Sequence, residues 1–216
     1  MDRDEIVIRD ANPDAEEGLA CGRFLDETAE GFFSLMLGRQ APEIIARAFT
    51  QTGHSYSYRN VAFAEHEGRI IGMTLGFTAG QHRDFSDRPL KKAAGPRALR
   101  MAVVKAICSP MIRILNSIED EEYYVLAVTV EKEFRGMGIG SVLMDSIEKK
   151  ARAAGCVRLA LDVSASNEGA IKLYERRGMR VESRWPKHRV IPGLRLFRMK
   201  KTLLTRTRAG EAIQAR

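Results

Sequence analysis

The sequence feature that most constrains the fold is a glycine-rich stretch over residues 135–140, Arg-Gly-Met-Gly-Ile-Gly. A run rich in β-branched residues, Val125 to Val130, precedes it. Apolar residues at helical spacing follow it: Ile139, Val142, Leu143, Ile147, Ala151 and Ala154. The glycines therefore lie where a strand leads into a helix, a junction with free backbone N–H groups at the positive end of the helix. Because glycine has no Cβ to block an approaching anion, the stretch predicts a phosphate or pyrophosphate site.

Two common phosphate-binding loops do not fit these residues. A Walker A loop requires Lys-Ser or Lys-Thr after its last glycine, whereas Ser141-Val142 follows here. A dinucleotide fingerprint places its glycines directly after the strand, whereas residues 131–135 intervene and Ser141 takes the third glycine position. Asp162 lies at about the right distance for a ribose contact, but only one unit of this kind is visible. A glycine-rich turn without a ligand is the plain alternative, since short motifs match by chance.

A second block of residues follows the predicted helix in a set order. It consists of Leu159 to Asn167, Ala170, Leu173-Tyr174 and Gly178-Met179. Together, the glycine stretch and this block resemble the GNAT family of N-acetyltransferases, in which an Arg/Gln-x-x-Gly-x-Gly/Ala loop precedes a strand, an Asn, a short helix with Leu-Tyr, and Gly-Phe. The second block is most similar to the protein N-terminal alanine acetyltransferases. The resemblance is detailed over residues 123–179 and elsewhere concerns only the order of elements.

The resemblance implies a single α/β domain over residues 1–204, with a mixed, mostly antiparallel central sheet flanked by helices on both faces. In this family the strands around the cofactor splay apart, and exposed backbone groups bind the pantetheine arm and the acetyl oxygen. By position, these groups belong to Val128 and Val130. The loop would hold the pyrophosphate of acetyl-CoA, and its members are Arg135, Gly136, Met137, Gly138, Ile139 and Gly140. Residues 205–216 are expected to fray.

Two further residues take their expected roles from the resemblance. Asn167 matches the family Asn that hydrogen-bonds the pantetheine arm, although its place before residues 168–170 also suits a helix N-cap. Tyr174 matches the general acid that protonates the leaving thiolate. Without the resemblance, Tyr174 would be interpreted as a core aromatic on the helix face that carries Leu173.

The general base is the least defined position. Asp162 takes the place of the Glu in the Leu-Glu-Val-x-x-x-Asn pattern of the N-terminal alanine acetyltransferases. Because Asp is one methylene shorter, a water relay is considered beside direct proton abstraction. Glu131 and Glu133, near the strand end, are alternative bases. Acidic residues of the first long helix could attract a cationic acceptor or form a solvated face: Asp26, Glu27 and Glu30.

The predicted function is transfer of an acetyl group from acetyl-CoA to a primary amine, by direct attack in a ternary complex. The amine could belong to a small molecule, a peptide or a protein, and a homodimer is left open. A non-catalytic acyl-CoA-binding or regulatory module is the alternative. No metal site is expected, because the three cysteines and four histidines are scattered along the chain.

The net charge of +7 first suggests a nucleic-acid partner. Much of the excess lies in residues 83–113 and 200–216, without a helix-turn-helix, zinc-finger or aromatic RNA-binding motif. The charge is therefore assigned to a solvated surface and an anionic cofactor, and no nucleic-acid partner is expected. No apolar run approaches membrane-spanning length and the N-terminus does not resemble a secretory signal, so a cytoplasmic protein without a membrane partner is predicted.

Local patterns predict the other elements. Strands are expected over Glu5–Arg9, Tyr56–Glu65, Arg69–Thr78, Arg180–Trp185 and Leu194–Lys200, and helices over Asp14–Phe33 and Pro42–Gln51. Residues 81–120 do not fit the family pattern. Prolines and a Gly-Pro pair break this segment into short pieces, one of which is a basic amphipathic helix over Arg97–Ile107. It is interpreted as a helical insertion, either packed against the sheet edge or forming a lid over the acceptor.

Overall fold

The computed structural model describes residues 5–186 and 195–203. In that part of the chain, a seven-stranded sheet has the order β1-β2-β3-β4-β5-β7-β6. The strands are β1 (Val7–Asp10), β2 (Val61–His66), β3 (Arg69–Thr78), β4 (Glu122–Val130), β5 (Arg158–Ser164), β6 (Arg180–Trp185) and β7 (Leu196–Thr202). Strands β4 and β5 are parallel, and the other neighbouring pairs are antiparallel. The predicted mixed, mostly antiparallel sheet is confirmed.

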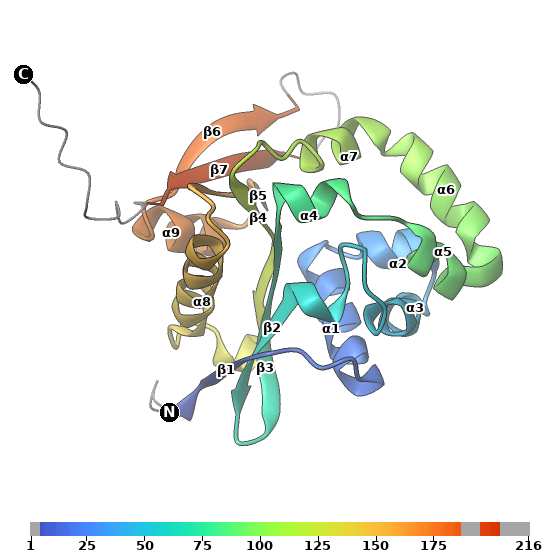
Figure 1. The fold of residues 1–216 in the computed structure, drawn as a ribbon, viewed down its shortest axis with the longest axis horizontal. Helices are drawn as coiled ribbons and strands as arrows, with labels where there is room; N and C mark the ends of the chain where they lie inside the picture. The colour runs from blue at the N-terminus through green and yellow to red at the C-terminus, as the bar shows by residue number, and fades with distance from the viewer. Residues whose placement is uncertain (1–4, 187–194, 204–216) are drawn as a thin grey trace, which may run out of the picture.

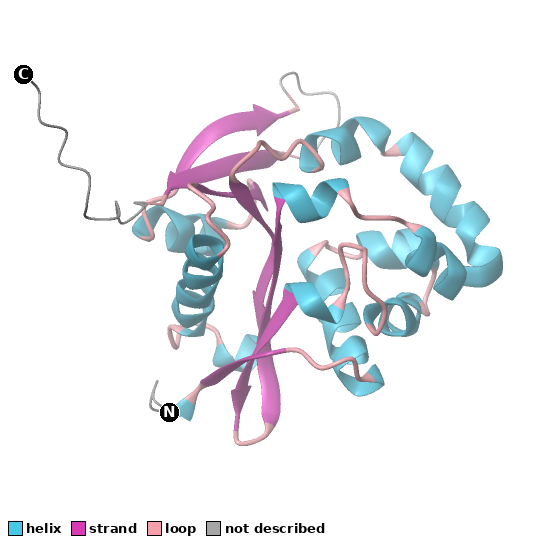
Figure 2. Cartoon of the chain, in the orientation of Figure 1, coloured by secondary structure: helices cyan, strands magenta, loops and turns pink. Residues whose placement is uncertain are grey.

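Helices cover both faces of this sheet (Figures 1 and 2). Helices α8 (Ile139–Ala153) and α9 (Glu168–Arg176) lie on one face. Helices α1 (Ala15–Thr28), α2 (Phe32–Leu37) and α3 (Ala41–Phe49) lie on the other. The expectation of helices on both faces is therefore also confirmed. None of the described helices combines the length and the apolarity needed to cross a bilayer.

The side chains of β5 alternate between two cores. Leu161 and Val163 belong to the core beneath α8 and α9. Ala160 belongs to the larger core beneath α1, α2 and α3. Because successive side chains of a strand point to opposite faces, Asp162 projects to the same face as Ala160, toward the α1 side. This alternation places the Asp162 side chain on the face of the sheet that α1, α2 and α3 cover.

The single helix expected over residues 14–33 is a wrong prediction, because the structure divides it. Helix α1 ends at Thr28 and α2 begins at Phe32. Between them, Glu30 and Gly31 have left-handed backbones, with φ of 50° and 82°. Glycine adopts this conformation without a steric penalty, whereas glutamate does not. Apolar residues keep helical spacing across the break, so the pattern alone did not reveal it.

Three strand boundaries also differ from expectation. The first strand is shifted from Glu5–Arg9 to Val7–Asp10, and β7 extends to Thr202. Strand β2 begins at Val61 instead of Tyr56, after a short 3-10 helix over Tyr58–Asn60. There the Asn60 amide donates to the His54 carbonyl at 3.0 Å, so a side chain serves a backbone group that a strand ladder would otherwise bind. Residues 187–194, the expected connection between the last two strands, and the expected frayed tail lie outside the described residues.

Residues 79–115 form four helices that arch around the α1–α3 side (Figure 1). They are α4 (Ala79–Arg83), α5 (Arg88–Ala94), α6 (Ala98–Ile107) and α7 (Ser109–Leu115). Leu90, Ala94 and Met101 are buried in the same core as α1, α2 and α3. This packing favours a fixed wall over a separately moving lid, because a lid would have to withdraw these side chains from the core.

Candidate active site

The glycine stretch connects β4 to α8, as the sequence predicts. Helix α8 begins at Ile139 after Gly138, and no side chain caps it. Gly136 and Gly138 have φ of 81° and 87°, in the left-handed region that favours glycine. In the described part of the chain, the N–H groups of residues 136–140 have no hydrogen-bond partner. Unpaired N–H groups at a helix N-terminus attract an anion, so this turn can hold a phosphate group.

The members of the turn differ in what they contribute. Gly140 allows close helix packing, because a Cβ there would lie 3.0 Å from Leu173 Cδ2 on α9. Ile139 is buried in a small core with Leu143, whereas Met137 is exposed. A Cβ on Gly136 would meet no atom within 4 Å, so its backbone conformation is what calls for glycine.

Arg135 binds neighbouring elements in this structure. Its Nε donates to the Val130 carbonyl at 2.9 Å, and its Nη2 lies 2.7 Å from Glu27 Oε1 on α1. The guanidinium therefore joins the turn to the end of β4 and to α1. Val130, whose backbone was expected to face the pantetheine arm, has its carbonyl occupied by this contact.

Strands β4 and β5 pair only over their first halves. Their register runs from Glu122–Arg158 to Val125–Leu161. Beyond that point both strands continue, β4 to Val130 and β5 to Ser164, without pairing to each other. The splayed strands implied by the resemblance are therefore present.

A cavity of about 70 Å³ lies in the gap between the splayed strands. It is lined by Thr28, Glu30, Val125, Leu126, Ala127, Val128, Leu161, Asp162, Val163, Ser164, Asn167, Ala170 and Tyr174. Thr28 and Glu30 come from the α1–α2 turn on one face of the sheet, and Ala170 and Tyr174 come from α9 on the other. The cavity thus touches both helical layers through the opening in the sheet.

Four predicted site residues meet at this cavity: Val128, Asp162, Asn167 and Tyr174. Val130 and the glycine turn are not among its lining residues. The alternative bases Glu131 and Glu133 lie elsewhere, in an open groove of about 920 Å³ beside the start of α1 and the β2–β3 turn. Both carboxylates form ion pairs with Arg69 there.

Tyr174 lines the cavity from the α9 side. Its side chain belongs to the core that includes Met144 and Leu161, and 7% of the residue is exposed. Burial raises the pKa of Tyr174 to about 12. The phenol therefore stays protonated at neutral pH and can donate a hydrogen bond to a group in the cavity.

Asn167 caps α9 and keeps a donor for a ligand. Its Oδ1 accepts a hydrogen bond from the Ala170 N–H at 3.1 Å. The side-chain amide has no hydrogen bond to any other residue that the structure describes. The helix-cap and ligand-binding interpretations of this residue are therefore compatible.

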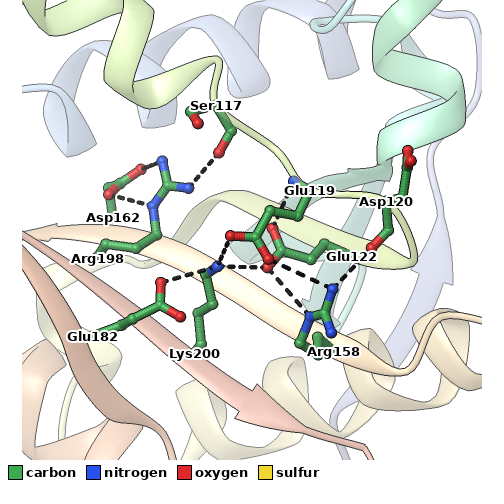
Figure 3. A network of polar contacts seen from close by, with 9 residues as sticks. All are labelled: Ser117, Glu119, Asp120, Glu122, Arg158, Asp162, Glu182, Arg198 and Lys200. Atoms are coloured by element: carbon green, nitrogen blue, oxygen red, sulfur yellow. Dashed lines mark hydrogen bonds and ion pairs between the residues drawn. The ribbon is translucent and has the colours of Figure 1, made fainter.

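The Asp162 carboxylate is held by a cation that the sequence analysis missed. Arg198 Nε donates to Oδ1 and Arg198 Nη2 donates to Oδ2, each at 2.8 Å (Figure 3). The Tyr124 hydroxyl also donates to Oδ2, at 2.8 Å. The sequence signal for Arg198 is a lone charged residue between apolar Phe197 and Met199, on a strand that was already expected. Such a residue is easily taken for a solvent-facing position of the strand.

The acidic residues near the α1–α2 turn have different partners. Asp26 accepts hydrogen bonds from the Ser34 N–H and hydroxyl, at 2.8 and 2.5 Å, and Glu27 pairs with Arg135. The Glu30 carboxylate has no partner among the described residues, and Glu30 lines the cavity. Its left-handed backbone is costly for a non-glycine residue, and such outliers concentrate at functional sites.

The family comparison agrees with this geometry. The model of the acetyltransferase (GNAT) family matches residues 24–179, a span that contains the glycine turn, both splayed strands and Tyr174. The chain belongs to the GNAT family. No group of three or more His, Cys, Asp or Glu side chains suited to a metal ion occurs in the described part of this GNAT protein.

Two curated relatives resemble parts of the chain. N-alpha-acetyltransferase MAK3 of Arabidopsis thaliana is 34% identical over 77 residues, which are 36% of this chain and 40% of that protein. The uncharacterized N-acetyltransferase YdgE of Bacillus subtilis (strain 168) is 34% identical over 58 residues, or 27% of this chain and 37% of that protein. The chain thus covers two fifths or less of the length of each relative.

Solved structures share the fold. A crystal structure of an acetyltransferase superposes with a TM-score of 0.65 at 24% identity, over 92% of this chain and all of that one. An N-acetyltransferase from Staphylococcus aureus Mu50 has a TM-score of 0.62 at 16% identity, over 90% of this chain and all of that one. A chain of the NatC complex bound to Gag peptide and CoA has a TM-score of 0.53 at 16% identity, over 93% of this chain and 99% of that one. These likenesses show that the chain shares the fold of the solved acetyltransferases.

Proposed function

We propose that this GNAT protein transfers the acetyl group of acetyl-CoA to a primary amine of a small molecule, a peptide or a protein. The observation that carries the proposal is the cavity between the splayed halves of β4 and β5, which touches helices on both faces of the sheet. A donor molecule and an acceptor can approach such an opening from opposite sides, as a direct transfer requires.

The residues present fit a nucleotide thioester. The unpaired N–H groups of residues 136–140 suit its pyrophosphate, and the unpaired edge of β4 at Val128 suits the amides of its pantetheine arm. The side-chain amide of Asn167, which has no hydrogen-bond partner among the described residues, offers a further donor at the cavity. When bound, acetyl-CoA supplies an acetyl group activated as a thioester.

The reaction moves one proton from the attacking nitrogen to the leaving sulfur. We assign the donor at the sulfur to Tyr174, which lines the cavity from the α9 side. Because burial raises the pKa of this phenol to about 12, well above that of a thiol, early proton transfer is unfavourable. Tyr174 first donates a hydrogen bond that strengthens as negative charge builds on sulfur, and its proton passes to the thiolate late, as the C–S bond breaks.

The acceptor side is assigned to the α1–α2 turn. The Glu30 carboxylate lines the cavity and has no partner in the part of the chain that the structure describes. It can attract a cationic amine and take a proton from it. Cys21, Cys108 and Cys156 do not line the cavity, and burial raises the pKa of the Cys21 and Cys156 thiols. A cysteine acyl-enzyme is therefore disfavoured, which supports direct attack in a ternary complex.

One observation favours a second candidate, a non-catalytic acyl-CoA-binding module. The cavity of about 70 Å³ is well below the roughly 300–1,000 Å³ of typical ligand pockets. A protein that binds the thioester in a closed site would have a cavity of this kind. Acetyl transfer requires the cavity to enlarge when acetyl-CoA and the amine bind.

A thiol-release screen with acetyl-CoA separates the two candidates. Purified protein is mixed with panels of primary amines and of peptides with different N-terminal residues, and the acetylated product is identified by mass spectrometry. Transfer predicts thiol release that depends on the amine and yields an N-acetyl product. Acetyl-CoA binding without any acetylated product would support the binding module.

A further inference from the structure

Arg198 is a buried cation that contacts the cavity residue Asp162, with an exposed side-chain fraction of 7%. It lies on β7 directly opposite Asp162 in the β5–β7 register. Besides its two hydrogen bonds to Asp162, its Nη1 donates to the Ser117 carbonyl at 2.6 Å. Its guanidinium carbon lies 5.4 Å from the centre of the Tyr124 ring. Arg198 thus contacts β4, β5 and the segment that follows α7.

That segment leads from the helical insertion back to β4, and a second cation of β7 holds it as well. Lys200 forms ion pairs with Glu119, Glu122 and Glu182 (Figure 3). Arg198 and Lys200 are two residues apart and therefore project from the same face of β7. In the contacts of Figure 3, Arg198 binds Asp162 and Lys200 does not. The two side chains therefore share the task of anchoring the insertion, whereas Arg198 additionally holds a cavity residue.

The hydrogen bonds of Asp162 leave one accepting position open. An ionised carboxylate has about four such positions, two on each oxygen. Oδ2 accepts from Arg198 and from Tyr124, so its two positions are filled. Oδ1 accepts only from Arg198 Nε in the described part of the chain. One position on Oδ1 is therefore available to a ligand of the cavity that Asp162 lines.

We propose that Arg198 is a positioning residue for acetyl transfer: it fixes Asp162 so that the open position on Oδ1 accepts a hydrogen bond from the acceptor nitrogen. Asp162 then orients the amine and does not remove its proton. This inference rests on the proposed acetyl transfer.

The charge of Arg198 supports the assignment. Burial acts to lower the pKa of Arg198, but its hydrogen bonds to Asp162 and the charge of that carboxylate outweigh burial, so the pKa lies above its ordinary value. The guanidinium stays charged at every pH used in an assay and holds Asp162 through a bidentate pair of hydrogen bonds. A carboxylate fixed in this way presents its remaining accepting position in one direction.

The test compares Arg198→Met with Lys200→Met, a control on the same strand and face. Both variants lose a cation that anchors the insertion, but only Arg198→Met releases Asp162. We expect Arg198→Met to lower kcat/KM for the amine about tenfold to a hundredfold, mainly through KM, with unchanged acetyl-CoA affinity. Lys200→Met should keep the wild-type KM. Equal effects in the two variants would overturn the proposal, since anchoring alone would then explain them.

Asp162→Asn separates orientation from base catalysis. The Asn oxygen can still accept a hydrogen bond from the amine but cannot take up a proton at neutral pH. The proposal predicts that the pH profile of kcat/KM keeps its wild-type midpoint and that the rate falls about tenfold or less. A collapse of the rate with loss of the acidic limb of the profile would make Asp162 the base and overturn the proposal.

Two controls keep the result interpretable. If removal of one charge prevents folding, the double variant Arg198→Met/Asp162→Asn leaves no unpaired charge and should show the raised amine KM of Arg198→Met. A wild-type KM in that double variant would refute the inference. A wild-type protein that acetylates no amine refutes both this inference and the proposed function. An active wild type with matching Arg198→Met and Lys200→Met variants refutes the inference alone.

Discussion

The replacement Tyr174→Phe removes one hydroxyl from the cavity wall and leaves the ring in place. The ring packs in the core beneath α8 and α9, and the hydroxyl has no hydrogen-bond partner within the described residues. Stability should therefore change by less than about 0.5 kcal/mol, because no protein hydrogen bond is lost. Loss of a well-placed proton donor should lower kcat by about a hundredfold, which corresponds to about 3 kcal/mol of barrier.

Tyr123→Phe is the matched control. Tyr123 has the same 7% exposure, belongs to the same core, and does not line the cavity. The assay measures kcat by thiol release at saturating acetyl-CoA, with the acetyl-CoA dissociation constant from calorimetry and the melting temperature of each variant. Wild-type kcat in Tyr174→Phe, or an equal loss in Tyr123→Phe, would refute the role of Tyr174 as the acid. Normal kcat with weaker acetyl-CoA binding would instead make the hydroxyl a binding contact.

Three other predictions concern protonation, the acceptor and the insertion. Because the pKa of Tyr174 is raised to about 12, the phenol stays protonated through pH 10, and kcat should not fall below that pH through loss of its proton. An alkaline fall of kcat below pH 10 that disappears in Tyr174→Phe would contradict the role of Tyr174 as a protonated donor. Glu30→Gln should raise KM for cationic amines about tenfold and leave acetyl-CoA affinity unchanged. An unchanged KM would show that Glu30 does not contact the acceptor. Met101→Ala should lower the free energy of unfolding by about 2–4 kcal/mol in denaturant, against less than about 0.5 kcal/mol for Leu99→Ala. The reason is that Met101 is fully buried, whereas Leu99 on the same helix is 75% exposed. Equal small effects would show that the insertion is not part of the core.

The glycine turn, the strand before it and the helix that Asn167 begins were all predictable from the sequence. In each of these the signal is local: glycines that end a strand, a run of β-branched residues, a capping side chain before a helix. The mixed, mostly antiparallel sheet and the splay of its strands followed from the family resemblance and not from a local pattern.

The partners of Asp162 and Glu30 were not predictable in the same way. The contact between Asp162 and Arg198 joins strands that are 36 residues apart, and no local pattern records which side chains face each other across a sheet. The break at Glu30 was hidden because apolar spacing continues through it. Only the fold reveals that Arg198 holds the Asp162 carboxylate and that the Glu30 carboxylate has no partner among the described residues.

Binding of the acetyl-CoA pyrophosphate at the turn before α8 is tested most directly with two glycines of similar conformation. Gly138 and Gly155 flank the start and the end of α8 with φ of 87° and 76°. Replacing either by alanine introduces comparable backbone strain, of about 1 kcal/mol, but only Gly138→Ala puts a Cβ beside the unpaired N–H groups. Calorimetric titration with acetyl-CoA should show affinity at least about tenfold weaker for Gly138→Ala and unchanged for Gly155→Ala. Wild-type affinity in a folded Gly138→Ala variant would show that the pyrophosphate does not bind at this turn.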